Sequence, residues 1–231
     1  MEQFKYHSTF GSIMYAMLCS RPDVAYPISA TSRFQANPGM THWTTVKNIL
    51  KYLRRTKDSI LVYGGDQELV VSGYTDASFQ TDRDDSKSQS GFVFLLNGGA
   101  VSWKSSKQDT TADSVTEAEY LAAGEAAKEG VWFKKFLTEL EVVPSISSPV
   151  DLYCDNTGAI AQSNEPKSHK KTKHILRRYH LIRQFVNDGW IKVKKVDGAT
   201  NTTDPLTKPL SRAAHELHVA SMGIRRMPDW L

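Results

Sequence analysis

Cysteine and long apolar stretches are both scarce in this chain, and each absence excludes a class of protein. The 231 residues contain two cysteines, Cys19 and Cys154, which give neither a disulfide framework nor the spacing of a metal-binding motif. No apolar run approaches the roughly 18–20 residues that span a bilayer. The first residues lack a basic stretch followed by an apolar core, so we predict no signal peptide and expect an intracellular protein.

Neither sign of charge is in large excess, but charge is unevenly distributed. The net charge is +4 at pH 7, and the 40% hydrophobic and 23% charged residues are typical of a globular domain. Residues 66–85 contain six acids and one arginine, whereas residues 167–195 contain ten basic residues and one acid. A basic block beside an acidic centre suits a polyanion held near a metal site, although a solvated basic helix would give the same run of charge.

The first 65 residues have the apolar spacing of helices. Apolar residues spaced three and four positions apart predict one helix that ends at Arg21-Pro22, a second over 24–35 and a third over about 41–55. A short strand is predicted over 61–63.

From residue 66 onward the period changes to that of strands. Residues 69–74, 91–96 and 100–104 are predicted strands, and Asn97-Gly98-Gly99 joins the last two as a hairpin. The elements expected after them are a long helix over 114–140, a strand over 150–154, a short helix over 156–162, a basic helix over 172–188, a strand over 190–196 and helical turns from about 203. This order predicts an α/β fold, a mixed sheet with helices on its faces.

Four acids stand where these elements begin or end, and they are Asp76, Glu119, Asp155 and Asp204. Such positions place side chains at the mouth of an α/β sheet. Carboxylates gathered there repel one another unless a divalent cation compensates them. Oxygen ligands suit Mg²⁺, and the pattern therefore indicates two-metal phosphodiester chemistry.

Each acid position can also be explained without catalysis. Asp76 could be a surface acid at a strand end, Asp155 could cap the next helix, and Asp204 before Pro205 could be an N-cap. Glu119 has apolar or small residues at helical steps after it and is therefore expected to face the sheet. Glu117 lies on a more solvated row and is expected to support the helix amino terminus.

Together these motifs resemble the ribonuclease H domain of a copia-type long-terminal-repeat retrotransposon Pol polyprotein. The segments that carry the resemblance over about residues 66–223 are Gly73-Tyr74-Thr75-Asp76-Ala77-Ser78, Ser102-Trp103-Lys104-Ser105-Ser106-Lys107-Gln108, Thr116-Glu117-Ala118-Glu119-Tyr120, Tyr153-Cys154-Asp155-Asn156, Lys173-His174-Ile175 and Asp204-Pro205-Leu206-Thr207-Lys208. Residues 9–63 resemble the helical segment that links reverse transcriptase to ribonuclease H in such polyproteins.

The resemblance implies a ribonuclease H-like fold with a mixed five-stranded sheet and flanking helices, preceded by a small helical segment. It divides the chain into a reverse-transcriptase C-terminal segment (1–65), a ribonuclease H-like domain (66–210) and a C-terminal helical tail (211–231). The implied reaction is hydrolysis of the RNA strand of an RNA–DNA hybrid. Asp76, Glu119, Asp155 and Asp204 would hold two Mg²⁺ ions, for which Mn²⁺ may substitute.

The resemblance also implies the partners of the chain. The residues expected to bind nucleic acid are Ser78, Asn156, Lys170, Lys171, Lys173, His174, Arg177 and Arg178. The upstream reverse-transcriptase domain would be a protein partner, with no membrane and no small-molecule substrate. The location would be cytoplasmic, in a virus-like particle, or nuclear.

Other classes of function are weighed by what the chain contains. No Tyr-x-Asp-Asp motif is present, so polymerase activity is rejected for this piece. A catalytically silent nucleic-acid-binding module derived from a retroelement is the alternative to the nuclease. A truncated Pol product, whose helical segment needs the missing polymerase to fold, is a third reading.

Overall fold

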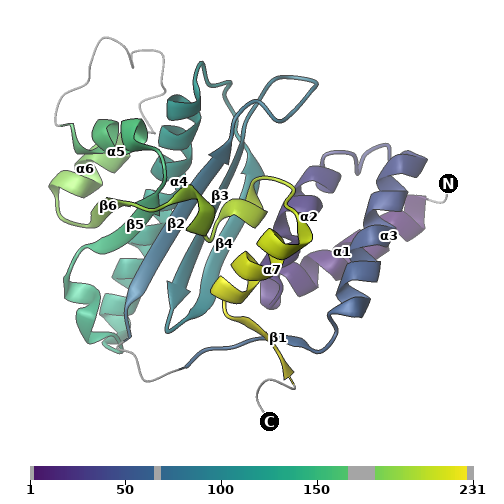
Figure 1. The fold of residues 1–231 in the computed structure, drawn as a ribbon, viewed down its shortest axis with the longest axis horizontal. Helices are drawn as coiled ribbons and strands as arrows, with labels where there is room; N and C mark the ends of the chain where they lie inside the picture. Colours follow the sequence, from purple (N-terminus) through teal and green to yellow (C-terminus); the bar gives the residue numbers. More distant parts are fainter. Residues whose placement is uncertain (1–2, 65–68, 166–179, 228–231) are drawn as a thin grey trace.

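The structure, a computed structural model, describes residues 3–64, 69–165 and 180–227 (Figure 1). Its first part is a helical segment of α1 (Gln3–Cys19), α2 (Ala25–Ser32) and α3 (Met40–Arg55). These helices share a core whose buried members are Tyr6, Phe10, Ile13, Val24, Ile28, Val46 and Ile49. The three predicted helices are therefore present.

A buried ion pair ties this helical segment together. Arg21 Nη2 lies 2.7 Å and its Nε 3.0 Å from the two carboxylate oxygens of Asp23, a bidentate arrangement. The hydroxyl of Tyr52, on α3, donates to Asp23 Oδ2 at 2.5 Å, and Arg21 also donates to the side chain and carbonyl of Thr56. Because the Arg21 and Asp23 side chains are only 9% and 0% exposed, each depends on the other for compensation.

The second part contains a mixed five-stranded sheet in the order β4-β3-β2-β5-β6. Strands β2 (Val71–Ser78), β3 (Gln89–Leu96) and β4 (Gly99–Lys107) run antiparallel. Strand β5 (Val150–Cys154) is parallel to β2, and β6 (Ile191–Lys195) is parallel to β5. The predicted α/β fold class is confirmed: the mixed sheet has five strands and flanking helices, and a small helical segment precedes it.

Helices cover both faces of the sheet. Successive side chains of each strand point to opposite faces, so both faces have residues to bury. Phe92 and Phe94 on β3 belong to the core between the sheet and the long helix α4 (Val115–Leu140). Helices α5 (Thr157–Asn164) and α6 (Leu181–Asn187) pack against α4. Close approach of α4 depends on Gly130, where an added Cβ would lie 2.9 Å from the Ile191 side chain and 3.1 Å from Phe94.

The opposite face carries the elements that link the two parts. Val93 and Leu95 of β3 pack with Ala25 of α2, and with Leu206 and Met222 from the C-terminal region. Short 3₁₀ turns, η5 (Gly198–Thr200) and η6 (Asp204–Leu206), lead to helix α7 (Arg212–Ser221) on this face. In Figure 1, α7 lies between the sheet and the helical segment.

The end of the described chain returns to its beginning. Strand β7 (Ile224–Arg226) pairs antiparallel with β1 (Ser59–Leu61), and Ile224 lies opposite Leu61. The stretch expected to be a helical tail thus contains a helix and a strand. Three residues are too few to show a period of two, and the pairing joins distant segments. The boundaries 1–65, 66–210 and 211–231 remain a prediction.

Two further expectations concern helices. The basic helix predicted over 172–188 falls partly outside the described residues, and its described part is α6, which ends at Asn187. None of the helices in the described ranges combines the length and apolar character needed to cross a membrane.

We predict that Asp23→Ala lowers the free energy of unfolding by about 3–5 kcal/mol, because it leaves the buried Arg21 guanidinium without its carboxylate. Urea denaturation followed by circular dichroism measures the change. Asp58→Ala, at an exposed acid after α3, is the matched control and should cost far less. A double change, Arg21→Met with Asp23→Leu, should recover much of the loss. Equal effects of Asp23→Ala and Asp58→Ala would contradict the prediction.

Candidate functional site

The sheet brings the four predicted acids to one place. Asp76 lies near the end of the central strand β2, and Asp155 directly follows β5, which runs parallel beside β2. Glu119 is in the second turn of α4, which packs across these strands, and Asp204 begins η6. Electrostatic coupling links Asp76 to Asp204 and to Glu119, and links Asp155 to both Asp76 and Glu119.

Asp76 is the common neighbour of the other three acids. It is 2% exposed, and burial is the main cause that raises the pKa of its carboxyl above the ordinary value. The charge of Asp204 raises this pKa further, whereas Lys208 and a hydrogen bond from Thr207 lower it. The centre of the group is therefore an acid that is costly to ionise without a nearby cation.

Glu119 is another buried acid whose ionisation is costly, and the effect on its pKa is large. It is 3% exposed, and burial, followed by the charges of Asp76 and Asp155, raises the pKa of its carboxyl to about 9. A hydrogen bond from the backbone N–H of Ala77 opposes the shift. Asp155 is half-buried, and its pKa is likewise raised by burial and by Asp76. The expectation that Glu119 faces the sheet agrees with this burial.

The structure also tests the helix-cap interpretation of Asp155 and the expected role of Glu117. The cap of α5 is Asn156, whose Oδ1 accepts the N–H of Ala159 at 3.0 Å, so Asp155 does not serve that purpose. Glu117 stabilises the start of α4, as expected: its Oε2 accepts the N–H of Asp113 at 3.0 Å.

Two residues of the site were not predicted to act there. Lys208 Nζ lies 3.0 Å from Asp204 Oδ1 and 3.7 Å from Asp76 Oδ2, and the Thr207 hydroxyl donates to Asp76 Oδ2. The spacing of four residues from Asp204 to Lys208 is a sequence signal of pairing on one helical face. The structure thus supplies one resident cation to two of the acids.

Cys154 lies at the same place although cysteine spacing gave no reason to include it. Ligand atoms of Glu119, Cys154 and Asp155 all lie within 4.8 Å of one another. Burial and the Glu119 charge raise the pKa of the Cys154 thiol to about 12, which keeps it protonated. Because a thiol binds metals as its thiolate, the oxygen atoms are the suitable ligands of this group.

The residues predicted to bind nucleic acid are only partly described. Ser78 ends β2 beside the acids and is half-buried. Asn156 follows Asp155; besides capping α5, its Oδ1 is 3.4 Å from the Thr116 hydroxyl. The others lie outside the described residues, and they are Lys170, Lys171, Lys173, His174, Arg177 and Arg178.

Comparison with known proteins gives relatives of one kind over almost the whole chain. The Retrovirus-related Pol polyprotein from transposon TNT 1-94 of Nicotiana tabacum is 45% identical over 94% of this chain. That from transposon RE2 of Arabidopsis thaliana is 34% identical over 97%. These matches cover 16% and 15% of the relatives, so the chain spans about one sixth of their length.

Shorter and more distant similarities were also found. Secreted RxLR effector protein 161 of Plasmopara viticola is 44% identical over 57% of this chain and 93% of that protein. The solved structure of LC11-RNase H1, isolated from compost, covers 60% of this chain and 92% of its own, with 17% identity and a TM-score of 0.45. No family model matches the chain. Over nearly its whole length, the chain is therefore similar to one segment of the retrovirus-related Pol polyproteins of transposons.

Proposed function

We propose that this chain is an endoribonuclease that hydrolyses the RNA strand of RNA–DNA hybrids with two divalent metal ions, as part of reverse transcription. The observation that supports the proposal most is the convergence of Asp76, Glu119, Asp155 and Asp204 from four separate segments around one buried carboxylate. A protein with no use for this arrangement would gain stability by losing it, because the acids repel one another.

The residues present fit a pair of Mg²⁺ ions. They offer carboxylate oxygens, which are hard ligands. Burial first, and then repulsion between the acids, raises the pKa values of Asp76, Glu119 and Asp155, and divalent cations would offset this cost of ionisation. When bound, the ions would supply activation of a water for attack on phosphorus and stabilisation of the leaving oxygen. Asp76, the neighbour of the other acids, would hold the ions together with Glu119, Asp155 and Asp204.

The protein groups around the acids would position the substrate. Thr207 holds the Asp76 carboxylate through its hydroxyl, and Lys208 holds Asp76 and Asp204. Ser78 follows Asp76 by two residues, and Asn156 directly follows Asp155. Both would contact the sugar–phosphate backbone, where a 2′-hydroxyl distinguishes RNA from DNA. The basic run over 167–195 would hold phosphates without sequence preference.

We predict that Asp76→Asn lowers the rate of hybrid cleavage by at least about 100-fold, because it removes the carboxylate that neighbours the other three acids proposed to hold the ions. The measurement is cleavage of a labelled RNA–DNA hybrid in Mg²⁺ or Mn²⁺, beside a matched DNA duplex that should stay intact. Asp84→Asn, in an exposed loop, is the control and should cleave as the wild type does. Binding of the hybrid without cleavage in either metal would instead favour the catalytically silent binding module.

We predict that Lys208→Met destabilises the metal-free protein by about 1 kcal/mol, since two buried carboxylates lose their resident cation. Thermal unfolding in EDTA measures the loss. Adding Mg²⁺ should raise the melting temperature of this variant more than that of the wild type, because the ions replace the missing charge. Lys208→Arg keeps the charge and should behave like the wild type. An unchanged melting temperature in EDTA would contradict the role assigned to Lys208.

We predict that the stability of the metal-free protein falls as pH rises between about 5 and 9. The pKa of Glu119 in the folded state, about 9, lies above its ordinary value, so the folded protein binds a proton that the unfolded chain releases in this range. Its contribution to stability is therefore present at low pH and lost through the folded pKa. Melting temperatures in EDTA across this range test the slope. Glu119→Gln should flatten it, and so should Mg²⁺; an equal slope in the variant and the wild type would refute this account.

A further inference from the structure

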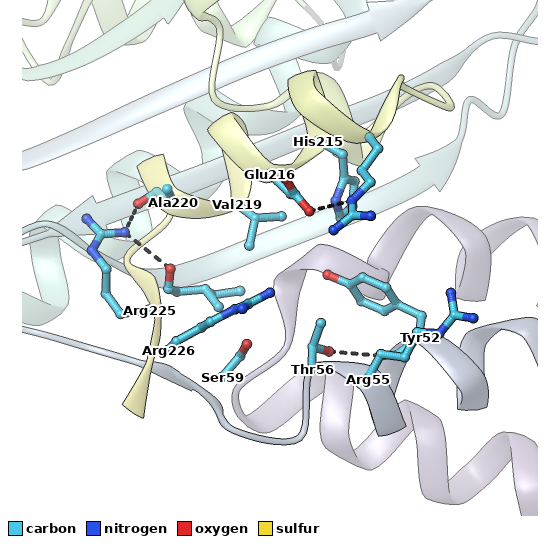
Figure 2. A pocket seen from close by; sticks show the side chains of 12 residues that line it. Tyr52, Arg55, Thr56, Ser59, His215, Glu216, Val219, Ala220, Arg225 and Arg226 are labelled. Carbon is cyan, nitrogen blue, oxygen red and sulfur yellow. Dashed lines mark hydrogen bonds and ion pairs between the residues drawn. The ribbon is translucent and has the colours of Figure 1, made fainter. Parts of the chain in front are cut away.

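A groove on the side of α7 remote from the carboxylates is lined by four arginines: Arg55, Arg212, Arg225 and Arg226. We call it the arginine groove. It has a volume of about 560 Å³ and runs between the end of α3, helix α7 and the paired strands β1 and β7 (Figure 2). The groove is therefore built from the first and the last segments of the described chain, which no sequence pattern brought together.

The positive charge of the arginine groove is only partly compensated. Glu216 pairs with Arg212 at 2.8 Å, and its pKa is lowered by Arg212 first and also by Arg226 and His215. Within the described ranges, Arg55 and Arg226 make no ion pair, and both are exposed. A surface of this kind attracts a polyanion rather than an apolar partner.

Arg225 has a structural task in addition. Its Nη1 donates to the carbonyl of Ala220 and, at 3.2 Å, to that of Ile224, which closes the end of α7. Experiments on the groove are therefore best made at Arg55 and Arg226.

A second groove, lined mainly by apolar residues and also by Asp23, extends from the arginine groove as far as Lys208. Its volume is about 490 Å³, and it shares Tyr52, Arg212 and His215 with the arginine groove. Its lining also includes Lys208, the residue that pairs with Asp76 and Asp204. Lys208, Arg212 and the other arginines of the arginine groove thus form a series of positive charges that leads from the acids along α7. Ten residues of helix span about 15 Å, roughly the rise of four or five phosphates along one strand of a duplex.

We propose that the arginine groove binds the phosphate backbone of the nucleic-acid strand that continues beyond the cleavage site. This rests on the proposed function, because the carboxylates set the point from which the path is measured. The groove would extend the contact with the hybrid onto α3 and β7 and would add affinity without reading sequence. The guanidinium groups suit this ligand, since their planar donors match phosphate oxygens.

The test compares two RNA–DNA hybrids, a short one that covers the carboxylates alone and one extended by about ten base pairs. Binding is measured by fluorescence anisotropy in EDTA, where no cleavage is expected. The extension should raise the affinity of the wild type about tenfold, and the double variant Arg55→Gln with Arg226→Gln should lose most of that gain. The slope of log affinity against log salt on the extended hybrid should fall by about 2, one unit for each phosphate that the variant no longer neutralises.

The matched control is Arg54→Gln with Arg83→Gln. Arg54 is exposed and adjacent to Arg55 on α3 but does not line the groove, and Arg83 lies in an exposed loop, so the change in net charge is the same. The control should keep the gain from the extension. Equal losses in both double variants would show an effect of net charge alone and would overturn the proposal. No gain from the extension in the wild type would overturn it as well.

A measurement on the unchanged protein guards against a folding defect of the variant. Methylphosphonates, which are uncharged, replace phosphates four to seven positions from the cleavage site, about the reach of the path along α7. They should weaken wild-type binding and should weaken binding of the Arg55→Gln, Arg226→Gln variant much less. Weakening of the same size in both proteins would place the contact elsewhere.

Failure of this inference is distinguishable from failure of the proposed function. Absence of hybrid cleavage in Mg²⁺ or Mn²⁺ would count against the nuclease, yet the dependence of binding on the extension and on Arg55 and Arg226 would still support the groove. Normal cleavage together with groove variants that bind like the control would reject the groove alone. A protein ligand at this place would give the latter result.

Discussion

The burial of Asp76 among three other carboxylates is the constraint on which the rest of the site depends. Asp204 raises the free energy of ionising Asp76, and Asp76 and Asp155 raise that of ionising Glu119. The low exposure of Asp76 and Glu119 removes the water that would screen these charges. The packing of the fold must therefore fix the positions of the acids, and nearby positive charge must compensate them. Lys208 supplies part of that charge from within the chain, and a deficit remains that divalent cations are suited to meet.

The scaffold meets this constraint by placing the acids on rigid elements with small neighbours. Strand β2 is central, α4 is anchored across it through close contact at Gly130, and Asp155 follows a parallel strand hydrogen-bonded to β2. The Asp204 turn is fastened by Leu206, whose side chain is fully buried against the second face of the sheet. Mutual repulsion cannot spread the acids apart while these cores stay packed.

The fold and the four acids could be predicted from the sequence because each leaves a local signal. A short apolar run before the Asn97-Gly98-Gly99 hairpin signal predicted β3, three- and four-residue spacing predicted α4, and the acids stand at element ends. The contacts of Thr207 and Lys208 with Asp76, and that of Cys154 with Glu119, could not be predicted in this way. They depend on how the segment after η6 meets β2 and on how β5 meets α4 in space. The pairing of β1 with β7 left no signal either, because three-residue strands have no measurable period and their partners are far apart in sequence.

That pairing has a consequence for the whole molecule. Because β7 is hydrogen-bonded to β1, and α7 contacts both η6 and β7, the chain that follows the Asp204 turn is held against the first part of the molecule. Residues 1–65 are then not only a connection to what precedes them: through Ala25 and Tyr52 they contact the elements that carry Asp204 and Lys208. A change in the seating of the helical segment would move one acid relative to the other three, which are fixed by β2, β5 and α4. The geometry of the acids is therefore a property of both parts of the chain together.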